Sequence, residues 1–168
     1  MSRAPVVHYV PIPRNIIYKF LDPLNLSKKD VLWDLGCGDG RILIAAAKHY
    51  GTRAIGVEIR RGLARIAHRN IVKHSLTDRA EVIHGDFFRI RITSATAITL
   101  YLSTRVNEAL KGKFCKELRD GTRIASLDFR IPGWEPNSII KCNDGIRSHN
   151  IYLYVFKRSK YICGENAP

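Results

Sequence analysis

A glycine-rich segment, Asp34-Leu-Gly-Cys-Gly-Asp-Gly40, is the part of the sequence best suited to bind a ligand. The apolar run 30–36 predicts a buried strand and residues 41–50 predict a helix, so the glycines lie at a strand-to-helix turn. Glycine accepts positive φ and lets the backbone approach a ligand closely. The candidate binding residues here are Asp34, Gly36, Cys37, Gly38, Asp39 and Gly40. The alternative interpretation is a tight turn without a ligand.

An acidic residue, Glu58, ends the next predicted strand, 24 positions after Asp34. Nucleotide-binding sheets place an acidic residue about 20 positions beyond the loop, where it binds ribose hydroxyls. The alternative is a solvated carboxylate at a strand end. The glycine spacing is not that of dinucleotide sites, and no Gly-Lys-Ser/Thr follows, which disfavours nicotinamide cofactors and Walker-type triphosphates. A nucleoside without a pyrophosphate is the ligand that remains.

A third acidic residue, Asp86, follows the predicted strand 80–84 and precedes Phe87 and Phe88. Its carboxylate is placed to accept a hydrogen bond from an adenine amine while Phe87 covers the adenine ring. Taken alone, the segment reads as a turn aspartate with buried phenylalanines. Together with Asp34 and Glu58, it becomes the third point of a nucleoside pocket.

The elements that must position these residues alternate along the chain. Strands are predicted at 30–36, 53–59, 80–84, 95–102 and 122–129, and helices at 16–24, at 41–50, over about 14 residues from position 60, and at 104–119. This alternation implies crossover connections and a parallel sheet. Strands 138–142 and 150–157 flank a turn and predict an antiparallel hairpin. We therefore expect a doubly wound, Rossmann-like α/β sheet of seven strands, mostly parallel, with one reversed strand at the edge.

Length and charge set the wider frame. The 168 residues fit a single domain, 1–168, with 161–168 as a frayed tail. Lys and Arg number 28 against 15 Asp and Glu, a net charge of +13, which favours polyanions or acidic surfaces as partners.

The cysteines and the apolar segments predict the compartment. The 4 cysteines contain no CxxC pair, which indicates neither a metal site nor a disulfide framework. No apolar run is long enough to span a membrane, and no signal peptide is evident. A cytoplasmic protein without membrane contact is expected.

The motifs at 34–40, Glu58 and Gly85-Asp86 resemble motif I, the second-strand acidic residue and the adenine motif of class I S-adenosylmethionine-dependent methyltransferases. Residues 9–13, 117–126 and 131–134 are similar to the small archaeal protein lysine methyltransferases, relatives of the non-SET histone lysine methyltransferases. The resemblance implies S-adenosyl-L-methionine as cofactor, with 1–13 lying over it. It adds Tyr9, Pro11 and Tyr101 to the cofactor-binding candidates, which already include Phe87. The family's Pro-Thr-Pro reads Pro11-Ile12-Pro13, so any contact made by the Thr hydroxyl is missing.

A lysine amine is the acceptor that the resemblance implies. After the fourth strand the chain reads Leu100-Tyr-Leu-Ser103, which lacks the Asn/Asp-Pro-Pro-Tyr/Phe pattern of enzymes that methylate planar amines, and no Pro-Cys pair supports a covalent pyrimidine mechanism. Deprotonating lysine at neutral pH costs about 4 to 5 kcal/mol, which an aromatic channel that excludes water would offset in part. The catalytic candidates that would line it are Tyr9, Tyr101 and Trp134. Phe129 also falls near a strand end, and the alternative is that two or more of these four aromatic residues belong to the core.

The predicted helix after Glu58 carries a basic stripe of Arg61, Arg65, Arg69 and Lys73 at helical spacing. It is either a weak, non-specific nucleic-acid contact or a solvated helix face. The leading hypothesis is a monomeric protein-lysine N-methyltransferase of broad specificity that acts on chromatin or other basic proteins. An RNA methyltransferase is the alternative, and a non-catalytic nucleic-acid-binding module comes third.

Overall fold

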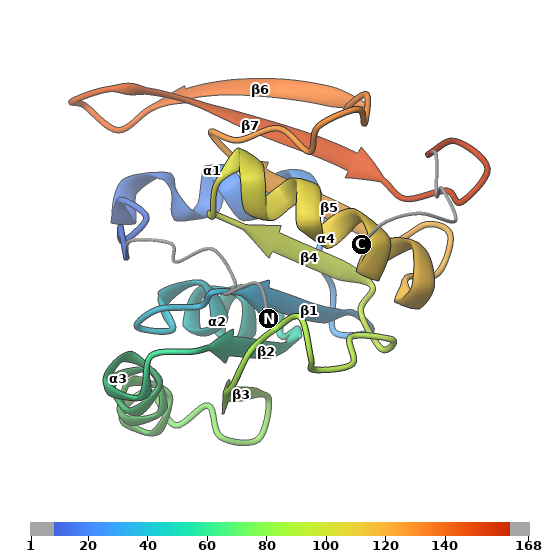
Figure 1. Cartoon of the computed structure of the whole chain (residues 1–168). Helices are drawn as coiled ribbons and strands as arrows, with labels where there is room; N and C mark the ends of the chain where they lie inside the picture. The colour runs from blue at the N-terminus through green and yellow to red at the C-terminus, as the bar shows by residue number, and fades with distance from the viewer. Residues whose placement is uncertain (1–8, 162–168) are drawn as a thin grey trace.

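The computed structural model describes residues 9–161, and its centre is a seven-stranded mixed sheet in the order β3-β2-β1-β4-β5-β7-β6 (Figure 1). The strands are β1 (Val31–Leu35), β2 (Arg53–Glu58), β3 (Ala80–His84), β4 (Ala97–Leu100), β5 (Arg123–Leu127), β6 (Ser138–Asn143) and β7 (Ser148–Val155). Strands β1 to β5 pair in parallel, while β7 pairs antiparallel with both β5 and β6. The predicted Rossmann-like sheet with a C-terminal hairpin is confirmed.

The position of the reversed strand differs from the expectation. β7 lies between β5 and β6 instead of at the edge. β6 has no buried residue, whereas β7 buries His149, Ile151 and Tyr154. The strand with inward-facing side chains therefore takes the inner place, and the more exposed strand becomes the edge.

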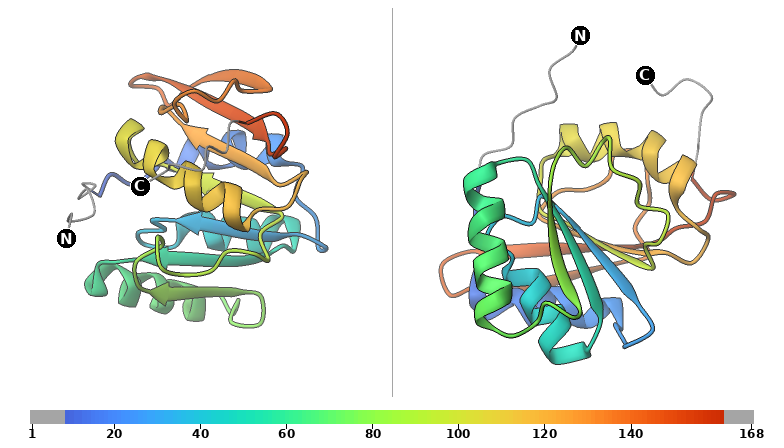
Figure 2. Two further views of the ribbon diagram at one scale, coloured as in Figure 1. Left: turned by 45° about the vertical axis from the view of Figure 1, so that its right-hand side comes forward. Right: turned by 90° about the horizontal axis from the view of Figure 1, so that it is seen from below.

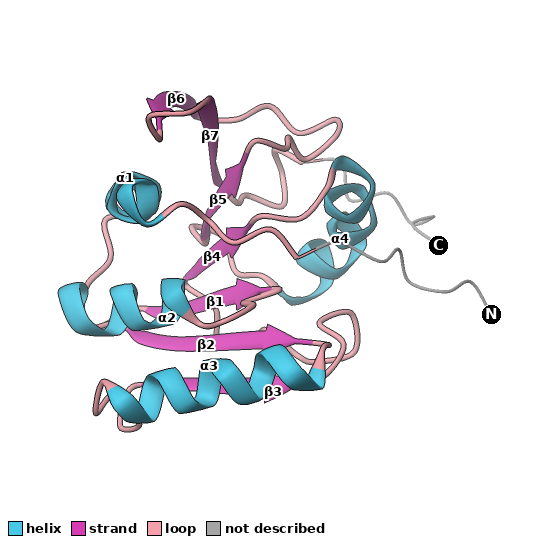
Figure 3. Cartoon of the chain, turned by 90° about the vertical axis from the view of Figure 1, so that its left-hand side faces the viewer, coloured by secondary structure: helices cyan, strands magenta, loops and turns pink. Residues whose placement is uncertain are grey.

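Helices cover both faces of the sheet. They are η1 (Arg14–Ile16), α1 (Ile17–Leu21), η2 (Asp22–Leu24), α2 (Arg41–Ala45) with its π-helical continuation η3 (Ala46–Tyr50), α3 (Arg61–Lys73) and α4 (Thr104–Glu117). α1, α2 and α3 lie on one face and α4 on the other (Figures 2 and 3). The link from β3 to β4 consists of turns and bends, and no helix was predicted there.

The core has two halves, one on each face of the sheet. One half includes Phe20 and Leu43 beside the first two helices, and the other includes Phe114, Trp134 and Tyr154 beneath α4. Tyr161 belongs to the second half, because it is buried and stacks on Trp134 with ring centroids 4.2 Å apart. The expectation of a frayed tail is therefore wrong for Tyr161, while 162–168, like 1–8, lie outside the described residues.

One cysteine also departs from expectation. Cys37 and Cys142 are free thiols, whereas Cys115 on α4 is disulfide-bonded. The prediction of no disulfide is therefore wrong for Cys115. None of the helices within 9–161 combines the length and apolar character needed to cross a bilayer.

Candidate functional site

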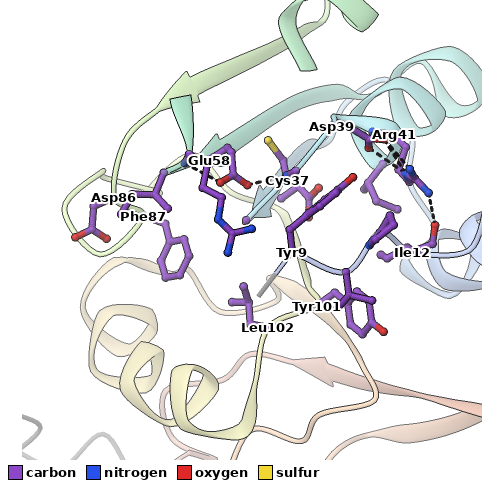
Figure 4. A pocket seen from close by; sticks show the side chains of 18 of the residues that line it. Tyr9, Ile12, Cys37, Asp39, Arg41, Glu58, Asp86, Phe87, Tyr101 and Leu102 are labelled. Atoms are coloured by element: carbon purple, nitrogen blue, oxygen red, sulfur yellow. Dashed lines mark hydrogen bonds and ion pairs between the residues drawn. The ribbon is translucent and has the colours of Figure 1, made fainter. Parts of the chain in front are cut away.

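A pocket opens at the carboxyl ends of β1, β2 and β4 and beside the turn after β3, where the strand order reverses between β1 and β4 (Figure 4). Its volume is about 1010 Å³ with its open mouth included. In open α/β sheets this is the place where ligands bind. The predicted site residues that line it are Tyr9, Pro11, Asp34, Gly36, Cys37, Gly38, Asp39, Glu58, Asp86, Phe87 and Tyr101.

The glycine loop is held in place by β2. The N–H groups of Gly36 and Cys37 donate to the carbonyl of Val57, at 2.9 and 3.0 Å. Glu58 accepts at Oε2 from the N–H of Gly38 at 3.0 Å and at Oε1 from the N–H of Arg60 at 2.8 Å. The buried Glu58 carboxylate therefore shapes the loop as well as facing the pocket.

Position 38 has no room for a side chain. Its φ of +55° lies in the left-handed region, and a Cβ there would come within 2.4 Å of the Tyr9 ring. The ring therefore lies directly against the loop, across the pocket (Figure 4). Burial and the neighbouring Asp39 carboxylate raise the pKa of Tyr9, so its hydroxyl stays protonated. Cys37 contributes backbone only, because its thiol is buried against Gly56.

Asp34 is buried beneath the loop. Its Oδ1 accepts a 2.9 Å hydrogen bond from the hydroxyl of Thr99, and no cationic group within residues 9–161 pairs with it. Burial, together with the nearby Glu58 carboxylate, raises the pKa of Asp34 to about 7. Two carboxylates close together in a buried site favour a cationic ligand, because a positive charge stabilises both ionised forms.

Arg41 lines the pocket and was not among the residues that the sequence indicated. Its guanidinium pairs with Asp39 at 2.6 Å and donates to the carbonyl of Ile12 at 2.7 Å. The N-terminal segment is thereby tied to the glycine loop through a backbone oxygen, while the Ile12 side chain is buried. The contact made at position 12 therefore does not depend on a hydroxyl. Nothing in the sequence around Arg41 indicates that it contacts Ile12, which lies 29 residues earlier in the chain.

Asp86 reaches the pocket, but its carboxylate is already engaged. Its Oδ1 accepts from the N–H of Phe88 at 2.9 Å, and the group points to the outer side of the site (Figure 4). Phe87 turns its ring toward the centre. The segment is therefore both a turn stabilised by the Asp86 carboxylate and a part of the pocket wall.

Two predicted residues are not brought to the pocket. Gly40, with φ of +80°, lies at the start of α2, where a Cβ would stand 3.1 Å from Ala67 of α3, so it permits close helix packing. Trp134 is buried in the core beneath α4, among Phe114, Phe156 and Tyr161. The assignment of Trp134 to the acceptor channel is corrected: its ring gains more from burial against three aromatic side chains than a pocket edge offers.

The remaining pocket wall is mostly apolar. Sequence analysis did not assign these lining residues: Val10, Ile12, Arg41, Ile42, Ile59, Arg60, Phe88 and Leu102. Leu102 lies below Gly36, where a Cβ on the glycine would come within 2.9 Å of it. Apolar side chains near a turn carry no spacing signal, which is why only the structure assigns them.

This arrangement fits a nucleoside cofactor that carries a positive charge. The loop exposes backbone without side chains, the ends of β1 and β2 supply carboxylates, and Phe87 and Leu102 supply apolar surface for a flat ring. Glu58 would hold the sugar of such a cofactor and Phe87 would cover its base. The buried Asp34 carboxylate favours the positively charged part of the cofactor.

Sequence comparison places the chain among known methyltransferases. The family of the ANTKMT methyltransferase domain matches residues 34–138. The chain is 46% identical over 161 residues, 95% of its own length and 100% of the relative's, to a protein-lysine N-methyltransferase of Saccharolobus islandicus (strain REY15A). It is 27% identical over 107 residues, 64% of its own length, to the adenine nucleotide translocase lysine N-methyltransferase of Mus musculus, of whose length it spans 47%.

A solved structure agrees with the fold over nearly the whole chain. The crystal structure of an RNA methyltransferase from Salinibacter ruber, in complex with S-adenosyl-L-homocysteine, superposes with a TM-score of 0.83 at 32% sequence identity. The match covers 95% of this chain and 99% of that one.

Proposed function

This chain belongs to the S-adenosylmethionine-dependent protein-lysine N-methyltransferases of the ANTKMT methyltransferase family, and we propose that its substrates are a broad range of basic proteins, among them proteins bound to DNA. The observation that carries the lysine assignment is the 46% identity to a lysine methyltransferase over that relative's full length. The pocket supports the methyl-donor part of this proposal, because the glycine loop, Asp34, Glu58 and Phe87 line it together at one edge of the sheet.

When bound, S-adenosylmethionine supplies a methyl group on a positively charged sulfur. The task of the chain is then to orient this donor and the acceptor nitrogen in line, since no catalytic triad is needed for a displacement with a built-in leaving group. We assign the ribose to Glu58, the adenine ring to Phe87, and the backbone contacts to Gly36 and Gly38. Tyr9 and Pro11 cover the donor from the N-terminal side.

The acceptor lysine must arrive as a free amine. Tyr9, Tyr101 and Leu102 offer a wall of aromatic and apolar groups that excludes water, which disfavours the ammonium form. No side chain is assigned as a general base. The rate should therefore rise toward alkaline pH as the free-amine fraction grows.

The proposed breadth of substrates rests on where the described residues are used. Most residues between 9 and 161 form the sheet, its helices and the pocket, which leaves few side chains to read the sequence around a lysine. A site that recognises mainly a flexible, exposed lysine accepts many proteins.

Proximity to nucleic acid is supported by α3. A groove beside this helix is lined by Arg61, Arg65, Arg69, His68 and His84 together with Ala64 and Val82. No ion pair within residues 9–161 neutralises Arg61, Arg65, Arg69 or Lys73. Such a surface attracts phosphates without reading sequence, which would bring the enzyme close to proteins that are bound to DNA.

The test compares acceptor classes directly. The protein is incubated with methyl-labelled S-adenosylmethionine and, separately, with several unrelated lysine-rich proteins and with structured RNA, and products are identified by mass spectrometry. Methyl-lysine in several proteins supports the proposal, and label in a single protein contradicts its breadth. Label in RNA alone would establish the alternative suggested by the likeness to the Salinibacter ruber RNA methyltransferase.

A further inference from the structure

A chain of charged contacts connects the C-terminal hairpin to the pocket. His149 on β7 contacts Asp144 through Nε2 at 3.0 Å and Asp128 through Nδ1 at 2.8 Å. Arg147 lies 3.5 Å from the same Asp128 carboxylate and donates a 2.6 Å hydrogen bond to the hydroxyl of Tyr101. Of these residues, Tyr101 lines the pocket and the others do not.

The fold builds this chain at the end of the β5–β7 ladder. Asp128 follows β5 with φ of +62°, a left-handed conformation that is uncommon for aspartate, and its carboxylate also accepts from the N–H of Asn150 at 3.1 Å. In the hairpin turn, Asp144 accepts from the N–H groups of Ile146 and Arg147, both at 2.7 Å. Both carboxylates are thus fixed by backbone donors before they meet His149.

The geometry around His149 favours its protonated form. Each ring nitrogen faces a carboxylate oxygen, and both can donate to these oxygens only when the ring is an imidazolium. Nε2 also lies 3.4 Å from Nε of Arg147, a longer contact than those to the two carboxylates. His149 is fully buried, so a charge there needs partners on both sides. Burial by itself lowers the pKa of His149, but the hydrogen bonds to Asp144 and Asp128 outweigh it and raise the pKa above 6.5.

We propose that Arg147 and His149 are positioning residues for Tyr101, and that they hold its ring as the acceptor-side wall of the pocket. The inference rests on the proposed function in one respect, namely that the acceptor lysine passes Tyr101. Arg147 occupies an acceptor lone pair of the Tyr101 hydroxyl, and Phe129 lies beside the Tyr101 ring with centroids 6.4 Å apart. Losing Arg147 leaves the ring free to change rotamer at the pocket mouth.

The protonation state of His149 controls how firmly Arg147 positions the Tyr101 ring. The groups that face it are Asp128 after β5, Asp144 and Arg147 in the hairpin, and Cys142, its partner across β6, with Lys19 beyond. A neutral His149 can donate to only one carboxylate, so Asp128 and Asp144 then repel each other with one less cation between them. Because the pKa of His149 is raised, the hold is complete below pH 6.5 and is lost as the pH rises through that raised pKa.

The first test separates positioning from binding of the donor. Arg147→Met should raise KM for a lysine-rich protein about tenfold, as expected for losing a charged hydrogen bond, while leaving S-adenosylmethionine affinity and Tm nearly unchanged. Lys141 is an exposed basic residue of the same hairpin, so Lys141→Met is the matched control. It should leave KM, S-adenosylmethionine affinity and Tm unchanged. In a Tyr101→Phe background, Arg147→Met should add little, because both changes break one interaction. Additive effects, or an unchanged KM in Arg147→Met, would overturn the proposal.

The second test needs no turnover. Fluorotyrosine is incorporated and the resonance of Tyr101 is assigned by its loss in Tyr101→Phe. It should shift as His149 titrates in the wild type and stay constant in His149→Gln and Arg147→Met; a pH-independent resonance in the wild type would refute the coupling. In activity assays, KM of the wild type should be lower than KM of His149→Gln below the His149 pKa and should approach it above that pKa, because the titration of the acceptor amine affects both proteins equally. If the protein methylates no lysine, the proposed function fails, while the resonance still reports the hold on Tyr101.

Discussion

The N–H of Gly38 donates a 3.0 Å hydrogen bond to Oε2 of Glu58, so the acidic residue at the end of β2 and the glycine loop after β1 form one unit. Sequence reasoning treats these as two independent ligand contacts. In the structure, any change at Glu58 acts on the loop as well. The same carboxylate also receives the N–H of Arg60, which fixes the start of α3.

Replacing Glu58 tests this dual role. Glu58→Ala should lower S-adenosylmethionine affinity at least about 30-fold and reduce the free energy of unfolding by about 1–3 kcal/mol, because two backbone donors lose their acceptor. The domain should remain folded. Calorimetry and thermal unfolding measure the two effects. Glu81→Ala, at an exposed pair with Arg53, is the control, and an affinity within threefold of wild type would refute the assignment.

Asp34 should make donor binding depend on pH. Since its pKa is about 7 against an ordinary 3.8, the folded state holds a proton that the unfolded state has lost, and the free energy of unfolding falls as pH rises between these values, by up to ~1.4 kcal/mol per unit. A cationic donor favours the carboxylate, so binding should release a proton and tighten from pH 5.5 to 7.5. Calorimetry in buffers of different ionisation enthalpy measures the release. Asp34→Asn should abolish it, and a wild type without proton release would contradict this prediction.

Gly38→Ala should weaken donor binding about tenfold or more. The new Cβ would come within 2.4 Å of the Tyr9 ring and φ is +55°, so both the ring and the loop must shift. Gly62→Ala on α3 is the matched control, because nothing lies within 4 Å of its Cβ position. This control should leave binding unchanged and stabilise the helix by up to ~1 kcal/mol. Equal affinities for the two variants would show that Tyr9 does not close the loop in solution.

Trp134 should contribute to the stability of the fold and not to binding of the acceptor lysine. Trp134→Leu is expected to lower the free energy of unfolding by about 2–4 kcal/mol, because the ring packs among Phe114, Phe156 and Tyr161. KM for a protein substrate, measured at a temperature where the variant is fully folded, should stay within twofold. A large rise in KM without loss of stability would restore Trp134 to the acceptor channel.

The α3 stripe predicts salt-dependent attraction to nucleic acid. Changing Arg65 and Arg69 to Gln should weaken duplex DNA binding and reduce the slope of log affinity against log salt by about 2. Arg105 and Lys116, exposed on α4, provide a control with the same change in charge. If both pairs lower affinity equally, net charge alone is responsible and the stripe is a solvated face.

Most of the fold follows from local patterns. Strands with two apolar faces, such as β1 and β4, indicate a parallel sheet because only a buried strand tolerates them. The turn residues predict the hairpin, but they do not predict the order of its strands in the sheet. That order depends on which strand can bury His149 and Ile151 against β5, a comparison between segments that no single segment contains.

The amino-acid sequence alone determined the loop at 34–40, its acidic partners and therefore the class of cofactor, because these are short-range spacings that the strand-to-helix turn translates directly into geometry. Only the tertiary structure decided that Trp134 is core, that Gly40 packs against Ala67, and that Arg41 and Arg147 reach Ile12 and Tyr101. Each of these depends on contact between distant segments. An aromatic or an arginine has similar local preferences in a core, in a pocket wall and on a surface, and packing chooses among them.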